Sequence, residues 1–449
     1  MQPILIKNAR IVNEGVLQTG HVMCSNGRIT KIYGNNSEVP SGHSSLRIID
    51  AEGKILMPGI IDDQVHFREP GLTSKADIFS ESRAAVAGGI TSFMEMPNTS
   101  PPTTTISLLE EKNRIAARTS LANYSFFLGA TNDNIQELLK ADPRKVCGIK
   151  IFMGSSTGNM LVDDDNALRS VFSKVKIPVA VHCEDESIIQ ANTLAYKNKF
   201  GEDIPFSKHP EIRSEDACFK SSSYAVGLAK KYGTRLHVLH ISTEKELALF
   251  DSGTTLDKKH ITCEACIHHL WFDQSDYEQL GAKIKWNPAI KTAKDREALL
   301  RAVNNGIIDV VATDHAPHTE QEKSNKYFKA PSGGPMVQHS LVAMMELVRQ
   351  EKLTMEKLVD KMCHAPAILF NISERGFIRE GYYADLVLVD PEASWTVNRD
   401  NILYKCGWSP MEGQTFRSKV THTIVNGHVV YENGIFDEQP RSNQLTFNR

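Results

Sequence analysis

The sequence contains no apolar run of about 18 residues, which is the length that a membrane-spanning helix requires. Its first residues, MQPILIKNARIV, are followed by neither the long apolar segment nor the small-residue cleavage site of a signal peptide. An excess of charge of one sign is also missing, since 51 basic and 54 acidic residues leave a formal net charge of −3. We therefore expect neither membranes nor nucleic acid as partners.

A dense cysteine framework is missing as well. The eight cysteines are scattered, mostly within apolar segments, and are predicted to be reduced core thiols of a cytosolic protein. With 449 residues and a hydrophobic fraction of 41%, the chain is long and apolar enough for a large barrel or for two domains.

Short apolar runs alternate with helical patterns through the middle of the chain. The eight runs span residues 59–67, 89–97, 123–130, 147–153, 178–184, 235–242, 260–266 and 309–317. Helical patterns such as 74–89, 107–119 and 214–233 separate most of them. This alternation is typical of an α/β fold, either a (β/α)₈ barrel or a doubly wound open sheet, and eight strands favour the barrel.

Both ends of the chain are rich in β patterns broken by turn residues, as in SLRIIDAEGKILMPG and VTHTIVNGHVVYENG. We predict a barrel over residues 57–373 and a small β-sandwich accessory domain that residues 1–56 and 374–449 build together. Two Gly/Ser-rich stretches, 153–161 and 329–335, follow the fourth and eighth predicted strands. They are predicted to be loops over the active face.

Polar side chains recur at the ends of the predicted strands. Because the carboxyl ends of barrel strands meet at one face, residues far apart in sequence are expected to converge there on a single site. The residues in these positions are His66, Arg68, Asn98, Lys150, His182, His240 and Asp314.

Ordinary structural explanations exist for each of them. Lys150 could extend its amine to solvent, Asp314 could cap the following helix, and Arg68 could form a salt bridge with Glu69 or Asp62. These explanations are strong one at a time but weak together, because they leave the shared position at strand ends unexplained.

Imidazoles and carboxylates are the ligands that Zn²⁺ and similar metals prefer. In IIDDQVHFREPG, Gln64 and His66 share one face of a strand, where a metal enzyme would carry His-x-His. Lys150 is a poor ligand as an ammonium ion, but a carbamate formed from its neutral amine and carbon dioxide could bridge two metal ions. Burial and nearby cations both favour the neutral amine.

The sequence resembles the cyclic amidohydrolases, and within them the dihydroorotases, over nearly its whole length. HFREPG together with MPNT is the most discriminating pair of motifs. The other matching segments are GITSFMEMPNTSPPT, GIKIFM, VHCED, LHVLHIST, TCEACIHHL, WNPAIKTAKDREAL and ATDHAPH.

The resemblance implies Zn²⁺ as cofactor, with one or two ions per subunit and two favoured. It places the metal ligands at His66, Lys150, His182, His240 and Asp314, with Lys150 carboxylated and bridging. Asp314 would also be the general base. The residues implied in substrate binding are Arg68, Asn98 and His318 for a carboxylate and Asn287 for the ring. Arg68 also has its own rationale, because a guanidinium suits bidentate carboxylate recognition.

Two features depart from the family pattern. Gln64 stands where the family usually has the first histidine, so it would be a weak ligand and the first metal site weaker. KAPSGGPMVQHS differs from the family's usual loop and would reshape the rim of the pocket.

The implied activity is the reversible cyclisation of N-carbamoyl-L-aspartate to L-dihydroorotate and water in pyrimidine (UMP) biosynthesis. A homodimer and an association with a transcarbamoylase are further expectations. Three alternatives stay open at this point: an allantoinase or hydantoinase, a catalytically inactive homologue that acts as an assembly partner, and a barrel that binds a small molecule without metal. Arg68 argues against the first and Gln64 favours the second.

Overall fold

A closed parallel barrel occupies the middle of the chain in the computed structural model, which describes residues 2–40, 46–154 and 160–449. Its strands are β6 (Ile60–Val65), β7 (Ile90–Glu95), β8 (Asn123–Phe126) with β9 (Leu128–Gly129), β10 (Ile149–Phe152), β11 (Val179–His182), β12 (Leu236–Val238), β13 (Ile261–Cys266) and β14 (Val310–Ala312). One residue, Phe127, separates β8 from β9, and a parallel bridge between Val65 and His315 joins the last strand to the first. The predicted (β/α)₈ barrel is confirmed.

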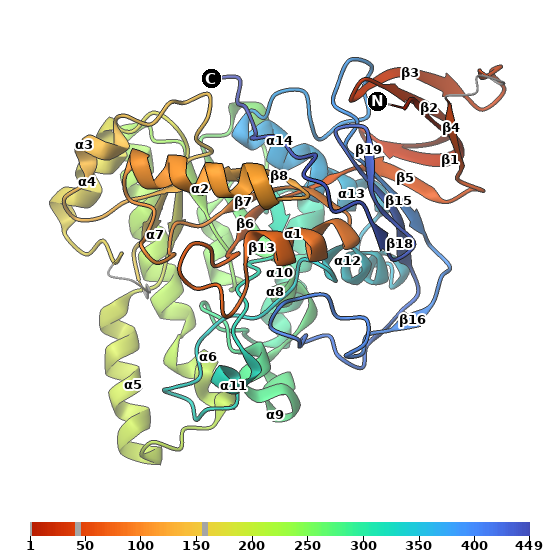
Figure 1. Ribbon diagram of the computed structural model, residues 1–449. Coiled ribbons are helices and arrows are strands. Elements are labelled where there is room, and N and C mark those ends of the chain that lie inside the picture. Colours follow the sequence, from red (N-terminus) through yellow and green to blue (C-terminus); the bar gives the residue numbers. More distant parts are fainter. Residues whose placement is uncertain (1, 41–45, 155–159) are drawn as a thin grey trace.

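Helices follow most barrel strands and cover the outside of the barrel (Figure 1). The longer ones are α1 (Ile78–Ala87), α2 (Ile106–Thr119), α4 (Asp165–Lys174), α5 (Glu186–Phe200), α7 (Glu215–Tyr232), α10 (Ala293–Asn305) and α12 (Ser340–Arg349). The short ones are α3 (Ile135–Leu138), α6 (His209–Ile212), α8 (Ile267–Trp271), α9 (Tyr277–Leu280), α11 (Glu320–Lys323), α13 (Met355–Val359) and α14 (Ala365–Phe370).

A polar residue that caps the first turn explains why several of the long helices begin where they do. The side chains of Asp77, Asp164, Ser214 and Thr292 accept hydrogen bonds from backbone N–H groups in the first turns of α1, α4, α7 and α10. Glycine in the left-handed conformation ends α10, at Gly306 with φ of 79°. The helices predicted at 74–89, 107–119 and 214–233 are confirmed.

The β-rich terminal part is confirmed and forms one nine-stranded sheet within the described residues. Its strands are β1 (Ile4–Asn13), β2 (Val16–Ser25), β3 (Arg28–Gly34), β4 (Arg47–Asp50), β5 (Ile55–Pro58), β15 (Leu386–Asp390), β18 (Lys419–Val425), β19 (His428–Glu432) and β20 (Ile435–Phe436). The two short strands β16 (Trp395–Thr396) and β17 (Thr415–Phe416) pair separately. N-terminal and C-terminal strands lie side by side in Figure 1, because β5 pairs with β15.

The two faces of the paired strands β5 and β15 pack into different cores, and this packing joins the sheet to the barrel. Leu56 and Leu388 are partners in the sheet and belong to the terminal domain's own core. Met57 and Val387, one position along, belong to the large barrel core. Because successive side chains of a strand point to opposite faces, one sheet serves two cores and fixes the terminal part against the barrel.

The cysteines are reduced, as predicted. All eight cysteines are free thiols, and Cys406 is the half-buried one among otherwise buried side chains. Residues 155–159 of the predicted loop 153–161 lie outside the described part of the chain. In the described ranges, no helix combines the length and apolar character needed to cross a membrane.

Candidate active site

A cavity of about 300 Å³ opens at the carboxyl ends of the barrel strands. It brings together every residue that the sequence analysis singled out, although they are spread over more than half of the chain. Those residues are Gln64, His66, Arg68, Asn98, Lys150, His182, His240, Asn287, Asp314 and His318. This position is where (β/α)₈ barrels carry their active sites.

His66 and Asp314 meet across the junction of the first and last barrel strands. The Nε2 atom of His66 lies 3.2 Å from Asp314 Oδ1, and its Nδ1 atom lies 2.7 Å from Asn98 Oδ1. Burial lowers the pKa of His66 well below its usual range, so the ring is neutral. Burial raises the pKa of Asp314 to about 7, and the positive charges of Lys150 and Arg68 are among the effects that oppose this increase.

His182 and His240 form a second pair. Their Nδ1 and Nε2 atoms, respectively, lie 3.0 Å apart, and the other nitrogen of His182 lies 2.9 Å from Glu184 Oε2. Arg213 donates from Nε to Glu184 Oε1 at 2.9 Å. This chain of contacts orients the His182 ring and directs its Nδ1 toward His240, as outer partners do for metal-binding histidines.

The buried Nδ1 atom of His240 has no hydrogen-bond partner among the described residues. Burial lowers the pKa of His240 well below its usual range and also lowers that of His182. Neutral imidazoles with nitrogen atoms directed at each other suit a shared metal ion, because the neutral ring is the form that coordinates.

Lys150 lies within β10 and is 1% exposed, so its amine does not extend to solvent. Burial lowers the pKa of this lysine to about 7. A substantial fraction of the amine is therefore neutral near neutral pH, the form that carbon dioxide can modify.

Arg68 is buried and makes its contacts with the segment after β14. Its Nε donates to the carbonyl of Pro317 at 3.1 Å, and its Nη2 lies 3.1 Å from His318 Nε2. Glu69 and Asp62, the partners considered for an ordinary salt bridge, instead accept hydrogen bonds from Ile78 N and the Thr313 hydroxyl. Burial lowers the pKa of His318 to about 3, so this ring is neutral beside the guanidinium.

Gln64 approaches Asp314 through its amide nitrogen. The Nε2 atom donates to Asp314 Oδ1 at 3.4 Å, while Oε1 accepts from the Cys266 thiol at 3.5 Å. An amide nitrogen has no lone pair for a metal, so Gln64 acts in this structure as a hydrogen-bond partner of Asp314. Helix capping does not explain Asp314, because Thr319 is the N-cap of α11.

The backbone is strained at three of these residues. Arg68, His240 and Asp314 have positive φ values of 69°, 41° and 43°. Such values are uncommon outside glycine and cluster at functional sites, where the surrounding structure holds them.

Several residues around the cavity had not been predicted from sequence. Glu184 stands two residues after His182 in VHCED, so proximity in sequence could have revealed it. Arg213 is distant in sequence and gives no such signal. The other lining residues that were not predicted include Phe152, Lys285, Trp286 and Phe328. Ala330, Pro331, Ser332 and Gly333 form the rim, and they belong to the stretch 329–335 that was predicted to be a loop over the active face.

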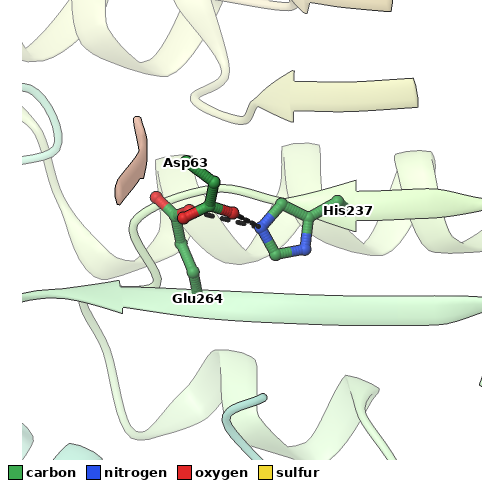
Figure 2. Close-up of side chains that lie close together, drawn as sticks. All are labelled: Asp63, His237 and Glu264. Carbon is green, nitrogen blue, oxygen red and sulfur yellow. Dashed lines mark hydrogen bonds and ion pairs between the residues drawn. The ribbon is translucent and has the colours of Figure 1, made fainter. Parts of the chain in front are cut away.

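A second polar cluster lies next to the cavity but outside its lining. Within the described residues, Asp63, His237 and Glu264 are grouped closely enough to hold a metal ion, and all three are fully buried (Figure 2). Although burial opposes the charged form, hydrogen bonds with Asp63 and Glu264 raise the pKa of His237 to about 9. No role for these three residues was predicted from the sequence.

Comparisons with known proteins match nearly the whole chain. A model described as the amidohydrolase family matches residues 55–430. A dihydroorotase of Methanosarcina acetivorans is 33% identical over 98% of this chain and 94% of its own length. A dihydroorotase of Staphylococcus epidermidis is 30% identical over 95% of this chain and 99% of its own length.

Solved structures resemble the chain over the same extent. An L-hydantoinase (dihydropyrimidinase) from Arthrobacter aurescens superposes with a TM-score of 0.92 at 28% identity, covering 99% of this chain and all of the other. A dihydropyrimidinase from Brevibacillus agri has a TM-score of 0.87 at 24% identity and covers the whole of both chains. At 24% identity, the similarity to the dihydropyrimidinase from Brevibacillus agri supports the fold alone.

Proposed function

The chain belongs to the amidohydrolase family, and from that premise we propose that it is a dihydroorotase. It interconverts N-carbamoyl-L-aspartate with L-dihydroorotate and water, in the biosynthesis of pyrimidines. Relatives named dihydroorotase, each similar over almost its full length, support this assignment. The observation that carries it is a buried guanidinium, that of Arg68, in the same cavity as the neutral imidazoles and the Asp314 carboxylate.

Zn²⁺ is the proposed cofactor, with two ions per subunit favoured over one. Its proposed ligands are His66, Lys150 as a bridging carbamate, His182, His240 and Asp314. The donor set fits a metal, because the buried rings are neutral and the nitrogens of His182 and His240 converge to 3.0 Å. When bound, the metal supplies Lewis acidity that activates water and polarises the amide carbonyl.

The protein's own residues hold the substrate and transfer the proton. Arg68, Asn98 and His318 bind the substrate carboxylate, so one ring carbonyl is held next to the attacking water. Asn287 contacts the ring. In ring opening, the Asp314 carboxylate takes a proton from the water and passes it to the departing ring nitrogen. Ring closure runs the same transfers in reverse.

Turnover of L-dihydroorotate and N-carbamoyl-L-aspartate by the zinc-loaded protein tests this function, with hydantoin, allantoin and dihydrouracil as a comparison panel. We expect turnover of the two carboxylated substrates and its loss on chelation. Preference for hydantoin, allantoin or dihydrouracil would instead indicate an allantoinase or hydantoinase activity. No turnover of any compound by folded, zinc-loaded protein would indicate an inactive homologue or one that requires a partner.

Substitution of Arg68 separates the substrate classes. We expect Arg68→Gln to lower kcat/KM for L-dihydroorotate by about 100-fold or more, because it leaves a carboxylate without its charged partner. The control is Arg83→Gln on α1, since Arg83 forms a surface ion pair with Glu438. Equal activity of the Arg68 variant and the control would contradict carboxylate recognition by Arg68.

We also propose a cytosolic location, consistent with eight free cysteines. A homodimer and an association with a transcarbamoylase remain predictions from the family resemblance.

A further inference from the structure

Two carboxylates converge on one nitrogen of a histidine inside the barrel. The Nε2 atom of His237 lies 3.2 Å from Asp63 Oδ2 and 3.2 Å from Glu264 Oε2. Figure 2 shows both carboxylate groups directed at that nitrogen. The predicted catalytic site does not use these three side chains, and each is fully buried.

The fold brings the three together from three barrel strands that lie on both sides of β14. His237 and Glu264 come from the adjacent parallel strands β12 and β13. Asp63 comes from β6, which pairs with β7 and not with either of those strands, so its side chain reaches them across the barrel interior. A register shift in β6 between Asp62 and Val65 interrupts the regular alternation at this point.

Hydrogen bonding defines which nitrogen of His237 carries a proton. The Thr262 hydroxyl donates its one hydrogen to the carbonyl of Leu236 at 3.1 Å. It therefore accepts from His237 Nδ1–H, 2.9 Å away. In the neutral ring, Nε2 then presents a lone pair to two carboxyl oxygens, so either a proton or a metal cation is required between these three atoms.

A divalent cation satisfies this cluster more completely than a proton does. A proton on Nε2 leaves Asp63 Oδ1 without a hydrogen-bond partner among the described residues, whereas a cation can bind to either oxygen of that carboxylate. A divalent cation balances both carboxylates, which matters in a site without solvent.

The spacing and the surroundings also suit a metal. The separations of 3.2 Å are close to the ligand–ligand distance of about 3.4 Å in a tetrahedral zinc site. Outer contacts are present too, because His237 donates to Thr262 and Glu264 Oε1 accepts from the backbone N–H of His240 at 3.2 Å.

We propose that Asp63, His237 and Glu264 form a buried site for a divalent cation of the Zn²⁺ class, separate from the catalytic metals. Binding releases the Nε2 proton if His237 is charged beforehand. The ion joins β6, β12 and β13 across the barrel interior, so its role is structural and goes beyond the proposed function.

Anomalous diffraction at the zinc absorption edge tests the site directly. The probe is Zn²⁺ itself, with protein produced in zinc-supplemented medium, purified without chelator and crystallised. We expect an anomalous peak between the three side chains, in addition to any peak beside His182. Absence of a peak between them overturns the proposal, whatever the catalytic site contains.

Metal content of variants provides a second readout. We expect Asp63→Asn to lose the buried peak and one zinc ion per chain by mass spectrometry. The matched control is Asp62→Asn, because this adjacent buried carboxylate binds Thr313 and lies outside the cluster. Equal loss in both variants, or in neither, contradicts the assignment. If Asp63→Asn does not fold, the wild-type map decides alone. Turnover is not used, so a failure of the dihydroorotase assignment stays distinguishable.

Discussion

Gln64 is the residue at which the site differs most from the family pattern that the sequence resembles. Its amide nitrogen donates to Asp314 Oδ1, and its oxygen faces the Cys266 thiol. The residue thereby helps to orient Asp314 without offering a metal ligand in this arrangement.

We expect Gln64→His to strengthen zinc binding by about tenfold or more, because imidazole is a better donor to zinc than a neutral amide. Competition with a zinc-sensitive chelator measures the affinity, and Gln64→Asn is the control that keeps an amide. Equal zinc affinity in the histidine variant and the wild type would mean that position 64 lies outside the coordination sphere.

Asp314 is the residue proposed to move the proton. Asp314→Asn should keep the fold, because the amide has nearly the same shape, and should lower kcat by at least about 100-fold. Circular dichroism and zinc content are measured with turnover, since Asp314 is also a proposed ligand. An Asp314→Asn variant with wild-type turnover would rule out this residue as the base.

At the scale of elements, two buried lysines hold the loop that forms the rim of the cavity. Lys323, at the end of α11, donates from Nζ to the carbonyls of Pro331 at 2.9 Å and Gly333 at 2.7 Å. Lys285 donates to the carbonyls of Tyr327 and Ala330, both at 2.7 Å. Hydrogen bonds from these two amino groups to backbone carbonyls thus fix the stretch where the sequence departs from the family's loop.

Loosening this loop should weaken substrate binding. We expect Lys323→Met to raise KM for L-dihydroorotate at least about fivefold, because loss of these bonds leaves buried carbonyls unpaired at about 1–3 kcal/mol. The loop also holds His318, whose Nε2 lies 3.0 Å from Ser332 O.

Lys326→Met is the matched control for this prediction, since Lys326 is an exposed residue of the same segment that pairs with Asp203. Steady-state kinetics of the two variants give the comparison. A KM within twofold of the wild type for Lys323→Met would contradict a positioning role of the lysine.

At the scale of the whole molecule, buried neutral histidines predict that the folded protein becomes less stable in acid. Burial lowers the pKa of His339 to about 3 and places those of His209 and His268 well below the usual range. Below about pH 6.5 the unfolded chain binds protons that the folded protein does not, so the free energy of unfolding decreases as the pH falls. This stability is fully present above that pH.

The contribution of His339 can be measured by itself, because it lies outside the cavity. Between pH 7 and pH 5 the wild type should lose roughly 2 kcal/mol more unfolding free energy than His339→Gln. Urea unfolding at both pH values gives the numbers, and His260→Gln, at an exposed position, is the control. The same pH dependence in all three proteins would show that His339 is not the source.

Much of the site could be predicted from the sequence, because its polar residues stand at the carboxyl ends of the predicted strands. The period of the apolar runs indicates eight strands, and a barrel brings their carboxyl ends to one face. His66, Lys150, His182, His240 and Asp314 therefore line one cavity. The barrel with a β-rich terminal part followed from the same local patterns, while the division into 1–56 with 374–449 and 57–373 stays a prediction.

Other features depend on contacts that sequence patterns do not encode. Arg213, at the end of α6, reaches Glu184 in the loop after β11, and Lys323 binds backbone carbonyls, which have no residue-type signature. Asp63 meets His237 and Glu264 across the barrel interior, at an interruption of the alternation in β6 that a period of two does not predict. The sequence by itself determined which groups stand at the strand ends, because alternation and helix signals are local. Only the tertiary structure decided which buried charges meet, because that depends on barrel closure and on pairing between distant strands.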